Sequence, residues 1–337
     1  MILPLVDSNQ WISLDWGSLG QNFWSVTVDG LTFGSIYALV ALGYTLVYGV
    51  LNLINFAHSE VFIAGAYACV FTLSALGFGP SLLSMPLYQL IGCLLAAAVA
   101  AMATSAAVAF LLERAAYKPL RTRNASRLSF LITAIGASFA IQYLIYLWRG
   151  ASAESAIVMF KPEQVKILGW YASVFGTPIY NYQVIIVVAA VAMMVIVDQF
   201  VRRSRLGRGI RAVAQDPDTA TLMGVDRERI IVTTFIIGGL LAGAAAVFYV
   251  MQVPSGVIYN GGFILGIKAF TAAVLGGIGN IRGALVGGLL LGLIGNYGQI
   301  LLGDSQWTDV VSFVVLVLIL MVRPTGLLGS DLGKARA

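Results

Sequence analysis

Long stretches without charge constrain this chain more than any other feature of its sequence. No charged residue stands between Gly30 and Val50, and none stands between Glu60 and Glu113. Charged residues make up only 10% of the chain, whereas they make up about a quarter of a typical soluble domain. Because a water-soluble protein of this size could not bury so much apolar surface, we expect an integral membrane protein. Each helix that crosses the hydrocarbon core needs about 20 apolar residues.

Nine apolar segments follow one another along the chain and predict an all-α, polytopic bundle. Three of them, at 58–77, 181–200 and 263–279, are short or interrupted, so they are candidates for broken or re-entrant helices. Eight and nine crossings therefore both remain open. The segments are 28–51, 58–77, 86–112, 128–148, 181–200, 230–253, 263–279, 283–302 and 306–322.

Lysine and arginine predict the orientation of the bundle. Three basic clusters fall on one side of the membrane if nine segments cross and the N-terminus lies outside. The clusters are Arg114, Lys118, Arg121, Arg123 and Arg127; Arg202, Arg203, Arg205, Arg208 and Arg211; and Arg323, Lys334 and Arg336. The predicted organisation is an extracytoplasmic tail at 1–27, a transmembrane domain at 28–325 with an outer loop at 149–180 and a cytoplasmic loop at 202–229, and a cytoplasmic tail at 326–337.

The loop at 202–229 predicts two short helices on the membrane surface. Asp216 and Pro217 mark the boundary between them, because proline disfavours helix at the preceding residue and suits the first helical position. Asp216 is placed to cap the second helix and Gly224 to end it. Leu222 would then face water unless a cytoplasmic partner covers it. The loop is thus either a solvated anchor for orientation or a docking surface.

A polar stretch, "LNLINFAHSE" at 51–60, interrupts the apolar sequence after the first segment. It contains the only histidine, His58, and Glu60 two residues later. If the helix continues, Asn52 and Asn55 share one face; if it breaks, Asn55 is placed to cap the next helix. In both cases the stretch predicts a polar hinge between two membrane helices.

A second polar break, "LGGIGNIRGALVGG" at 275–288, resembles the first and hints at an internal repeat. Its Asn280 is placed to cap the helix that follows. We hypothesise that both breaks line or gate a substrate route, and the plainer alternative is that the asparagines satisfy backbone groups at tight turns. The candidate pathway residues are Asn52, Asn55, His58, Glu60 and Asn280.

Several isolated features predict how the helices pack. Glycine patterns such as "GGLLAG" at 238–243 and "GLLLG" at 288–292 are typical of helices that approach closely. Lys268, inside an apolar segment, is expected to snorkel to the outer interface, and a contact with a substrate carboxylate is the lesser alternative. Gln142 and Asn296 are expected to form hydrogen bonds between helices.

No residue pattern supports chemistry by this chain itself. A Walker A pattern and a G-x-S-x-G motif are both absent, and one histidine with two cysteines makes no convincing zinc site. We predict no catalytic residue, no metal site and no bound cofactor. An ion-coupled secondary transporter remains the alternative class, because Glu60 is a carboxylate well placed between apolar segments.

Four stretches together resemble the permeases of branched-chain amino acid ABC transporters. Ser59 replaces the glycine usual in that family's "NFAHGE". The stretches are "GSIYALVALGYTLVYGVLNLINFAHSEVFIAGAY" at 34–67, "GRGIRAVAQDPDTATLMGVD" at 207–226, "KAFTAAVLGGIGNIRGALVGGLLLG" at 268–292 and "RPTGLLG" at 323–329.

The resemblance implies the permease subunit of an ATP-driven importer, without a fused ATPase, in the inner or plasma membrane of a bacterium. The implied partners are a second permease, two cytoplasmic ATPases that bind ATP and magnesium, membrane lipid, and an extracytoplasmic protein that delivers leucine, isoleucine or valine; no nucleic acid is expected. Urea, short amides and other amino acids are alternative substrates. The implied coupling loop contains Arg208, Arg211, Asp216, Pro217, Leu222 and Gly224.

Overall fold

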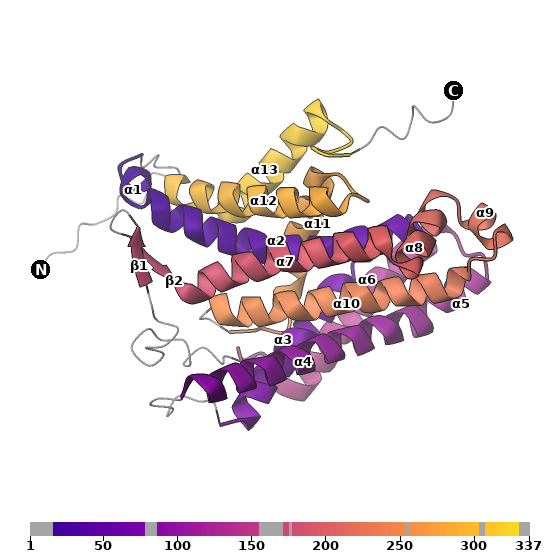
Figure 1. The fold of residues 1–337 in the computed structure, drawn as a ribbon, viewed down its shortest axis with the longest axis horizontal. Helices are drawn as coiled ribbons and strands as arrows, with labels where there is room; N and C mark the ends of the chain where they lie inside the picture. Colours follow the sequence, from indigo (N-terminus) through magenta and orange to yellow (C-terminus); the bar gives the residue numbers. More distant parts are fainter. Residues whose placement is uncertain are drawn as a thin grey trace, which may run out of the picture.

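The computed structural model describes residues 16–77, 86–154, 171–174, 177–253, 256–302 and 307–329. Within these residues, each of the nine predicted apolar segments forms a helix, which confirms the all-α membrane fold (Figure 1). The nine helices are α2 (Phe23–Leu51), α3 (His58–Ala75), α4 (Leu87–Leu112), α6 (Arg127–Arg149), α7 (Asn181–Arg203), α10 (Arg227–Gln252), α11 (Gly261–Gly276), α12 (Ile281–Leu302) and α13 (Trp307–Val322).

Shorter elements connect these helices. A small antiparallel hairpin, β1–β2, precedes α7 within the loop predicted at 149–180, of which residues 155–170 and 175–176 lie outside the described part. The short elements are α1 (Trp16–Gln21), the π-helical turn η1 (Glu113–Tyr117), α5 (Lys118–Thr122), β1 (Tyr171–Val174), β2 (Thr177–Tyr180), α8 (Arg205–Gln215) and α9 (Pro217–Leu222).

Helix lengths refine the predicted crossings. Six helices of the described chain are long and apolar enough to span a membrane: α2, α4 continued by η1 and α5, α6, α7, α10 and α12. The expectation of short helices is confirmed for α3, with 18 residues, and α11, with 16. It is wrong for α7, which runs unbroken over 23 residues because the helix continues past the apolar segment through Asp198 and Gln199 to a cap at Ser204. Similarly, α2 begins at Phe23 rather than at 28, so part of the predicted N-terminal tail is helical.

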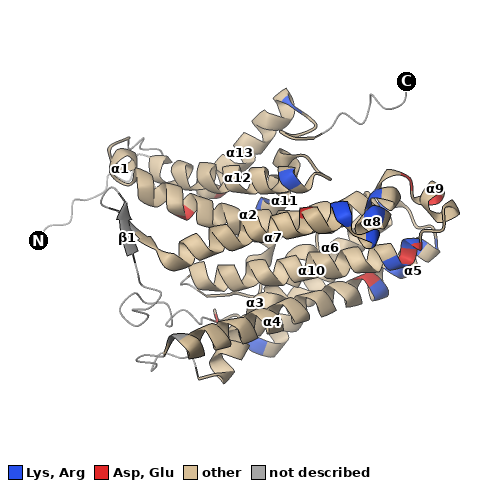
Figure 2. Cartoon of the chain, in the orientation of Figure 1, with Lys and Arg blue, Asp and Glu red and all other residues tan. Residues whose placement is uncertain are grey.

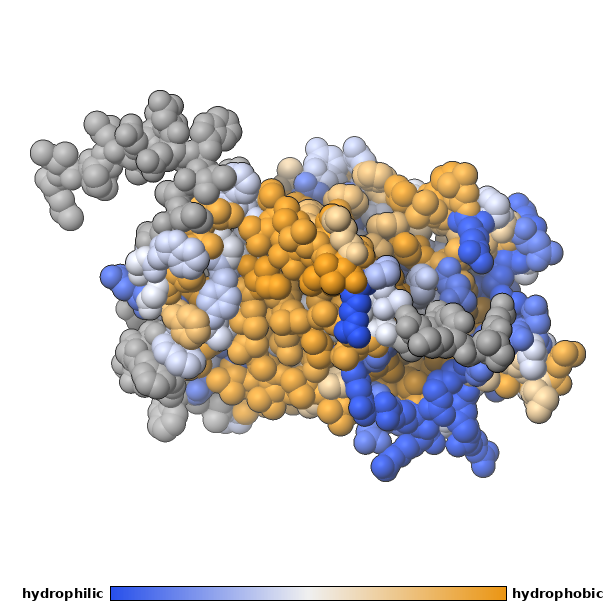
Figure 3. Space-filling view, turned by 90° about the horizontal axis from the view of Figure 1, so that it is seen from above, coloured by the Kyte–Doolittle hydropathy of each residue, from blue (hydrophilic) through white to orange (hydrophobic). Residues whose placement is uncertain are grey.

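Helix α2 is the centre of the bundle. In its most apolar window 83% of the residues are buried, whereas the figure is 22% for α4, α6 and α7. It packs against α3, α7, α10, α11 and α12. The outer helices present apolar side chains outward, and a hydrophobic surface covers the middle of the molecule (Figure 3). This distribution suits hydrocarbon rather than water as the surrounding solvent.

Glycines bring α2 and α12 into backbone contact. A Cβ atom added at Gly288 would lie 2.5 Å from the Cα atom of Ala38, and one added at Gly292 would collide with the carbonyl oxygen of Gly30. Gly239 and Gly243 of α10 meet α4 in the same way. The close packing predicted from "GLLLG" and "GGLLAG" is therefore confirmed.

Basic residues gather at one end of the bundle, which we call the basic end (Figure 2). At this end α4 and α7 finish and α6, α10 and α12 begin. The residues that define the basic end are Arg114, Lys118, Arg121, Arg123, Arg127, Arg202, Arg203, Arg205, Arg208, Arg211, Arg227 and Arg282. The clustering predicted for the first two groups is confirmed, and Arg227 and Arg282 lie at the same end. Of the third group, Arg323 directly follows α13, and Lys334 and Arg336 lie outside the described part.

Candidate functional site

The polar stretch after α2 is a true break in the helix. Asn52 takes a left-handed conformation, with φ 51° and ψ 34°, and its backbone N–H donates to the carbonyl oxygen of Tyr48. Asparagine tolerates this conformation better than most residues, which explains why the helix stops here. The side chain of Asn52 is exposed, so the alternative of one continuous polar helix face does not hold.

Asn55 holds the break together from inside. Its Oδ1 atom accepts hydrogen bonds from the backbone N–H of Ala57, at 3.1 Å, and from the hydroxyl of Tyr117 in η1, at 2.8 Å. The predicted role as a cap of the next helix is wrong, because Ala57 occupies the N-cap position of α3. Asn55 instead forms an Asx turn two residues before that N-cap, and its hydrogen bond with Tyr117 connects the turn to η1.

His58 is a buried packing residue at the start of α3. Its ring lies 4.9 Å from the ring of Tyr44, and a Cβ atom at Gly43 would collide with its Nε2 atom. Nε2 has no hydrogen-bond partner within the described residues. Glu60 is not bonded to it there, since positions two apart on a helix face different directions.

Glu60 connects α3 to α6. Its Oε1 atom accepts hydrogen bonds from Ser138, at 3.2 Å, from Gln142, at 2.9 Å, and from the neighbouring Ser59, at 3.3 Å. The side chain is fully buried, and no ion pair of the described chain includes it. The predicted interhelical bond of Gln142 is thus confirmed. Asn296 instead donates to the carbonyl oxygen of Gly292 in its own helix, contrary to prediction.

Ser59 fits because a glycine faces it. It lies in the first turn of α3 with an ordinary helical backbone, and its hydroxyl donates to the carbonyl oxygen of Phe56 at 3.0 Å. A Cβ atom at Gly266 of α11 would collide with the Cβ atom of Ser59. The missing side chain at Gly266 therefore provides the space that the serine occupies.

The second break lies beside the first. Asn280 accepts hydrogen bonds from the backbone N–H groups of Arg282 and Gly283, at 3.0 and 3.3 Å, and so caps α12 as predicted. Its side-chain amide also donates to the carbonyl oxygen of Leu328. Ile54 from the first break and Ile278 from the second line the same small cavity. The two breaks therefore meet, although Asn280 is only half-buried whereas Asn55, His58 and Glu60 are buried.

Two short helices at the basic end form the surface predicted from the loop at 202–229. Asp216 accepts hydrogen bonds from the backbone N–H groups of Asp218 and Thr219, and α9 begins at Pro217. Gly224, with φ +83°, follows the last turn. The predicted cap and end of α9 are thus confirmed.

Apolar side chains on this surface are left uncovered by the residues that the structure describes. Leu222 and Met223 are 87% and 81% exposed, although residues of α8 such as Val213 pack inward. Arg208 is exposed, and Arg211, also largely exposed, donates to the carbonyl oxygen of Val201 at 2.5 Å. The surface is capped at Asp216 and apolar at its tip, and the groove beside Leu222 is lined by three acidic residues and one arginine: Asp218, Asp226, Glu228 and Arg227.

An ion pair between α11 and α13 was not predicted. Lys268 Nζ lies 2.5 Å from Asp309 Oδ1 and 5.9 Å from the ring centroid of Tyr37 on α2. Lys268 thus has a carboxylate partner in the first turn of α13, whereas its expected extension to the outer interface stays a prediction. The sequence signal was an acidic residue at the start of an otherwise uncharged segment.

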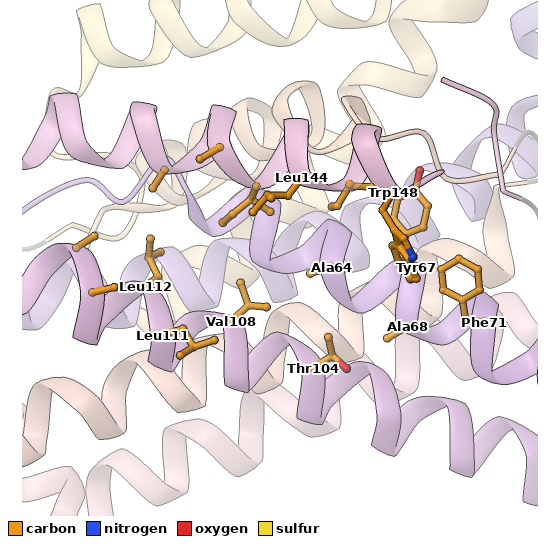
Figure 4. A pocket seen from close by; sticks show the side chains of 16 residues that line it. Ala64, Tyr67, Ala68, Phe71, Thr104, Val108, Leu111, Leu112, Leu144 and Trp148 are labelled. Carbon is orange, nitrogen blue, oxygen red and sulfur yellow. The ribbon is translucent and has the colours of Figure 1, made fainter. Parts of the chain in front are cut away.

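A large groove lies between α3, α4, η1 and α6 (Figure 4). Its volume is about 750 Å³, and its walls are almost wholly apolar, with Ala64, Val108, Leu111, Leu144 and Trp148 among them. No charged side chain lines it in the part of the chain that the structure describes. Such a groove suits hydrocarbon and offers nothing to the charged groups of an amino acid.

The sequence as a whole matches one protein family. A family model described as "Branched-chain amino acid transport system / permease component" aligns with residues 26–320. The chain belongs to this family. The permease is 46% identical over 303 residues to the high-affinity branched-chain amino acid transport system permease protein BraD of Pseudomonas aeruginosa, covering 90% of this chain and 94% of the relative.

Other proteins are similar to this permease over comparable lengths. The permease protein LivH of Escherichia coli, from a high-affinity branched-chain amino acid transport system, is 41% identical over 307 residues, with 89% of this chain and 94% of the relative covered. A solved metal-chelate type ABC transporter in an inward-facing conformation gives a TM-score of 0.49 at 17% identity, covering 94% and 93% of the two chains. The family and the apolar helices make the permease a multi-pass membrane protein.

Proposed function

We propose that this permease forms half of the membrane pathway of an ATP-driven importer for branched-chain amino acids. The observation that carries the proposal is the 46% identity to BraD along nine-tenths of the chain. A second permease would complete the pathway, an extracytoplasmic binding protein would deliver leucine, isoleucine or valine, and two partner ATPases would bind ATP and magnesium. The permease itself would hydrolyse nothing.

The basic end is proposed to face the cytoplasm. Positively charged loops stay on the cytoplasmic side of a membrane protein, and the arginines of α5, α8 and the start of α10 lie at this end. The N-terminus would then lie outside and the C-terminus inside. Cysteine-accessibility labelling at Arg123, in the turn before α6, and at Arg149, the last residue of α6, would test this orientation.

Helices α8 and α9 are proposed to couple ATP hydrolysis to transport. The exposed side chains of Leu222 and Met223 would give an ATPase an apolar contact, and the exposed Arg208 and Arg211 of α8 would add positive charge to the same loop. The caps at Asp216 and Pro217 make the unit rigid enough to transmit a displacement.

The pathway residues are proposed to act as a hinge. Asn55, His58 and Glu60 are buried inside the subunit, so they would control the route through the break at Asn52 and its neighbour at Asn280 rather than through contact with substrate. Substitution Asn55→Leu tests this role: a complex that assembles and transports normally with leucine at position 55 removes the hypothesis.

Reconstitution in proteoliposomes tests the proposed function. The permease, its partner permease, the two ATPases and the binding protein are combined, and uptake of labelled leucine is followed with ATP inside the vesicles. We expect uptake that requires ATP hydrolysis and persists when proton and sodium gradients are collapsed. Uptake driven by such a gradient without ATP would identify a secondary transporter instead.

Substitution Gly224→Val tests the coupling surface. Gly224 has a positive φ that valine adopts only with strain, and nothing surrounds it within 4 Å, so the change distorts the backbone without a steric clash. We expect ATP hydrolysis to continue while leucine uptake falls. The control is Gly136→Val on α6, where the surroundings are equally open and φ is ordinary. Unchanged uptake in the Gly224 variant would place the coupling site elsewhere.

A further inference from the structure

The ion pair between Lys268 and Asp309 stands apart from the other ion pairs of the described residues. The other pairs that join two helices all lie at the basic end, where they stabilise the ends of α5, α7, α9, α10 and α12. Lys268 lies near the middle of α11, its neighbour Tyr37 lies near the middle of α2, and Asp309 lies in the first turn of α13, so the pair is set among apolar helices away from the basic end. A charge there is costly and is commonly kept for a function.

The pair is partly accessible. The side chain of Lys268 is 16% exposed and that of Asp309 is 40% exposed. The carboxylate side chain is therefore the more exposed partner of the pair, and the ammonium group is the more buried one.

Apolar side chains flank the two charges. Ile264 lies one helical turn before Lys268, and Phe313 lies one turn after Asp309, so each shares a face with its charged neighbour. Both are exposed, at 54% and 40%. The surface thus combines one positive group, one negative group and an apolar border within a few ångströms.

We propose that Lys268 and Asp309 recognise the charged head of an α-amino acid during translocation, with Lys268 pairing with the substrate carboxylate and Asp309 with its ammonium group. The inference rests on the proposed function. It narrows the substrate class to zwitterions with an apolar side chain, which Ile264 and Phe313 contact. Urea and uncharged amides would make no use of such a pair.

Lys268 and Asp309 would exchange each other for the two charges of the substrate, and this exchange explains why the site can release its substrate. Before substrate arrives, each charge is paired with the other; with substrate bound, each is paired with the opposite charge of the zwitterion. No unpaired charge is left in either state, so the free-energy difference between them is small. Binding is therefore weak, as a route that must release its cargo requires.

Removing both charges distinguishes an ion pair that only stabilises the fold from one that binds substrate, because only in the second case would the change lower leucine uptake. Replacing a buried ion pair with apolar residues of similar size leaves no uncompensated charge and is often neutral for stability. The test is the double variant Lys268→Met with Asp309→Leu in the complete reconstituted complex. We expect normal assembly and basal ATP hydrolysis, but a loss of leucine uptake of about tenfold or more, as the removal of one strong charge contact predicts.

A matched control distinguishes this loss from a general effect of removing ion pairs. Arg149 and Glu154 form a partly buried pair at 2.7 Å near the opposite end of the bundle from the basic end. The double variant Arg149→Gln with Glu154→Gln should keep the wild-type uptake. Wild-type uptake in the Lys268 and Asp309 double variant would overturn the inference, and so would an equal loss in the control.

A labelling experiment keeps the inference testable if the double variant does not assemble. In a chain with Cys69 and Cys93 replaced by alanine, substitution Ile264→Cys places a thiol beside the pair. We expect leucine-loaded binding protein and ATP to slow its reaction with a small thiol reagent. An unchanged reaction rate would contradict the proposed contact. If the wild-type complex takes up leucine but these tests fail, the proposed function stands and only the inference is wrong. If the wild-type complex takes up no leucine, the proposed function itself fails.

Discussion

The hydroxyl of Tyr117 donates a 2.8 Å hydrogen bond to Oδ1 of Asn55, and both residues are buried. This bond joins the π-helical turn η1 to the break between α2 and α3. A break inside an apolar bundle leaves backbone and side-chain polar groups away from water, and each needs a partner. Tyr117 supplies one of them from a helix far along the chain.

Substitution Tyr117→Phe is expected to lower the free energy of unfolding by about 1 kcal/mol, because one buried hydrogen bond is lost while the ring still fills its space. Thermal unfolding of the permease in detergent would measure the change. Tyr143→Phe is the control, since the ring of Tyr143 is largely exposed on α6. Equal shifts in the two variants would contradict a specific role for the bond.

Gly266 and Ser59 are expected to compensate for each other. Substitution Gly266→Ala alone should destabilise the permease by about 2 kcal/mol, because its methyl group collides with Ser59. The combination with Ser59→Gly should recover most of that loss. A double-mutant cycle of unfolding midpoints measures the coupling, and strictly additive effects would show that the two positions do not share this space.

The contact between α2 and α12 is expected to tolerate no extra methyl group. Substitution Gly288→Ala should lower stability by about 2 kcal/mol or more, because the added Cβ atom would lie 2.5 Å from the Cα atom of Ala38 and the backbones would have to separate. Gly92→Ala on α4 is the matched control, with nothing within 4 Å of the added atom. Similar unfolding midpoints for both variants would exclude the backbone contact.

Arg121 is expected to be essential for the stability of the basic end. Its guanidinium pairs with Glu113 at 2.8 Å and with Glu228 at 2.9 Å, and Glu113 is fully buried. Substitution Arg121→Met leaves that carboxylate without its cation and should cost about 3 kcal/mol. Arg123→Met should change little, because Arg123 is exposed and forms no ion pair with any residue that the structure describes. Unfolding midpoints of the two variants measure this difference, and equal midpoints would contradict a special role for Arg121.

Leu222 is expected to contribute to ATPase binding without contributing to the fold. Substitution Leu222→Ala should leave the unfolding midpoint of the isolated permease unchanged and weaken its binding to the ATPases by about tenfold, as loss of an apolar anchor does. Leu147→Ala is the control, because Leu147 is similarly exposed but lies on α6 near the end opposite α9. Co-purification at graded ATPase concentrations measures both, and unchanged binding of the Leu222 variant would locate the contact elsewhere.

Much of the fold could be predicted from the sequence because charge is so sparse. Uninterrupted apolar runs determine where helices lie in a membrane, and local signals such as Asp216-Pro217 and Asn280 mark helix starts wherever the partner is a backbone group nearby. The same logic identified the break after α2 and the exposed tip at Leu222.

The site was harder to predict because its contacts join distant segments. Tyr117 meets Asn55, and Asp309 meets Lys268, only after the helices have packed, and nothing in the local sequence specifies either pair. For Asn296 the sequence predicted a contact between helices that does not form. Its side-chain amide donates to a carbonyl oxygen of its own helix, so a polar residue in an apolar run does not by itself imply an interhelical bond.

The glycine contact between α2 and α12 also limits how the permease can move. Two helices whose backbones touch cannot slide or tilt against each other without first separating, so they form a single rigid body at the centre of the subunit. Changes of shape during a transport cycle must therefore come from the helices around it. The largely exposed α6, the short α13 and the break before α3 are the parts that this rigid centre leaves free to change position.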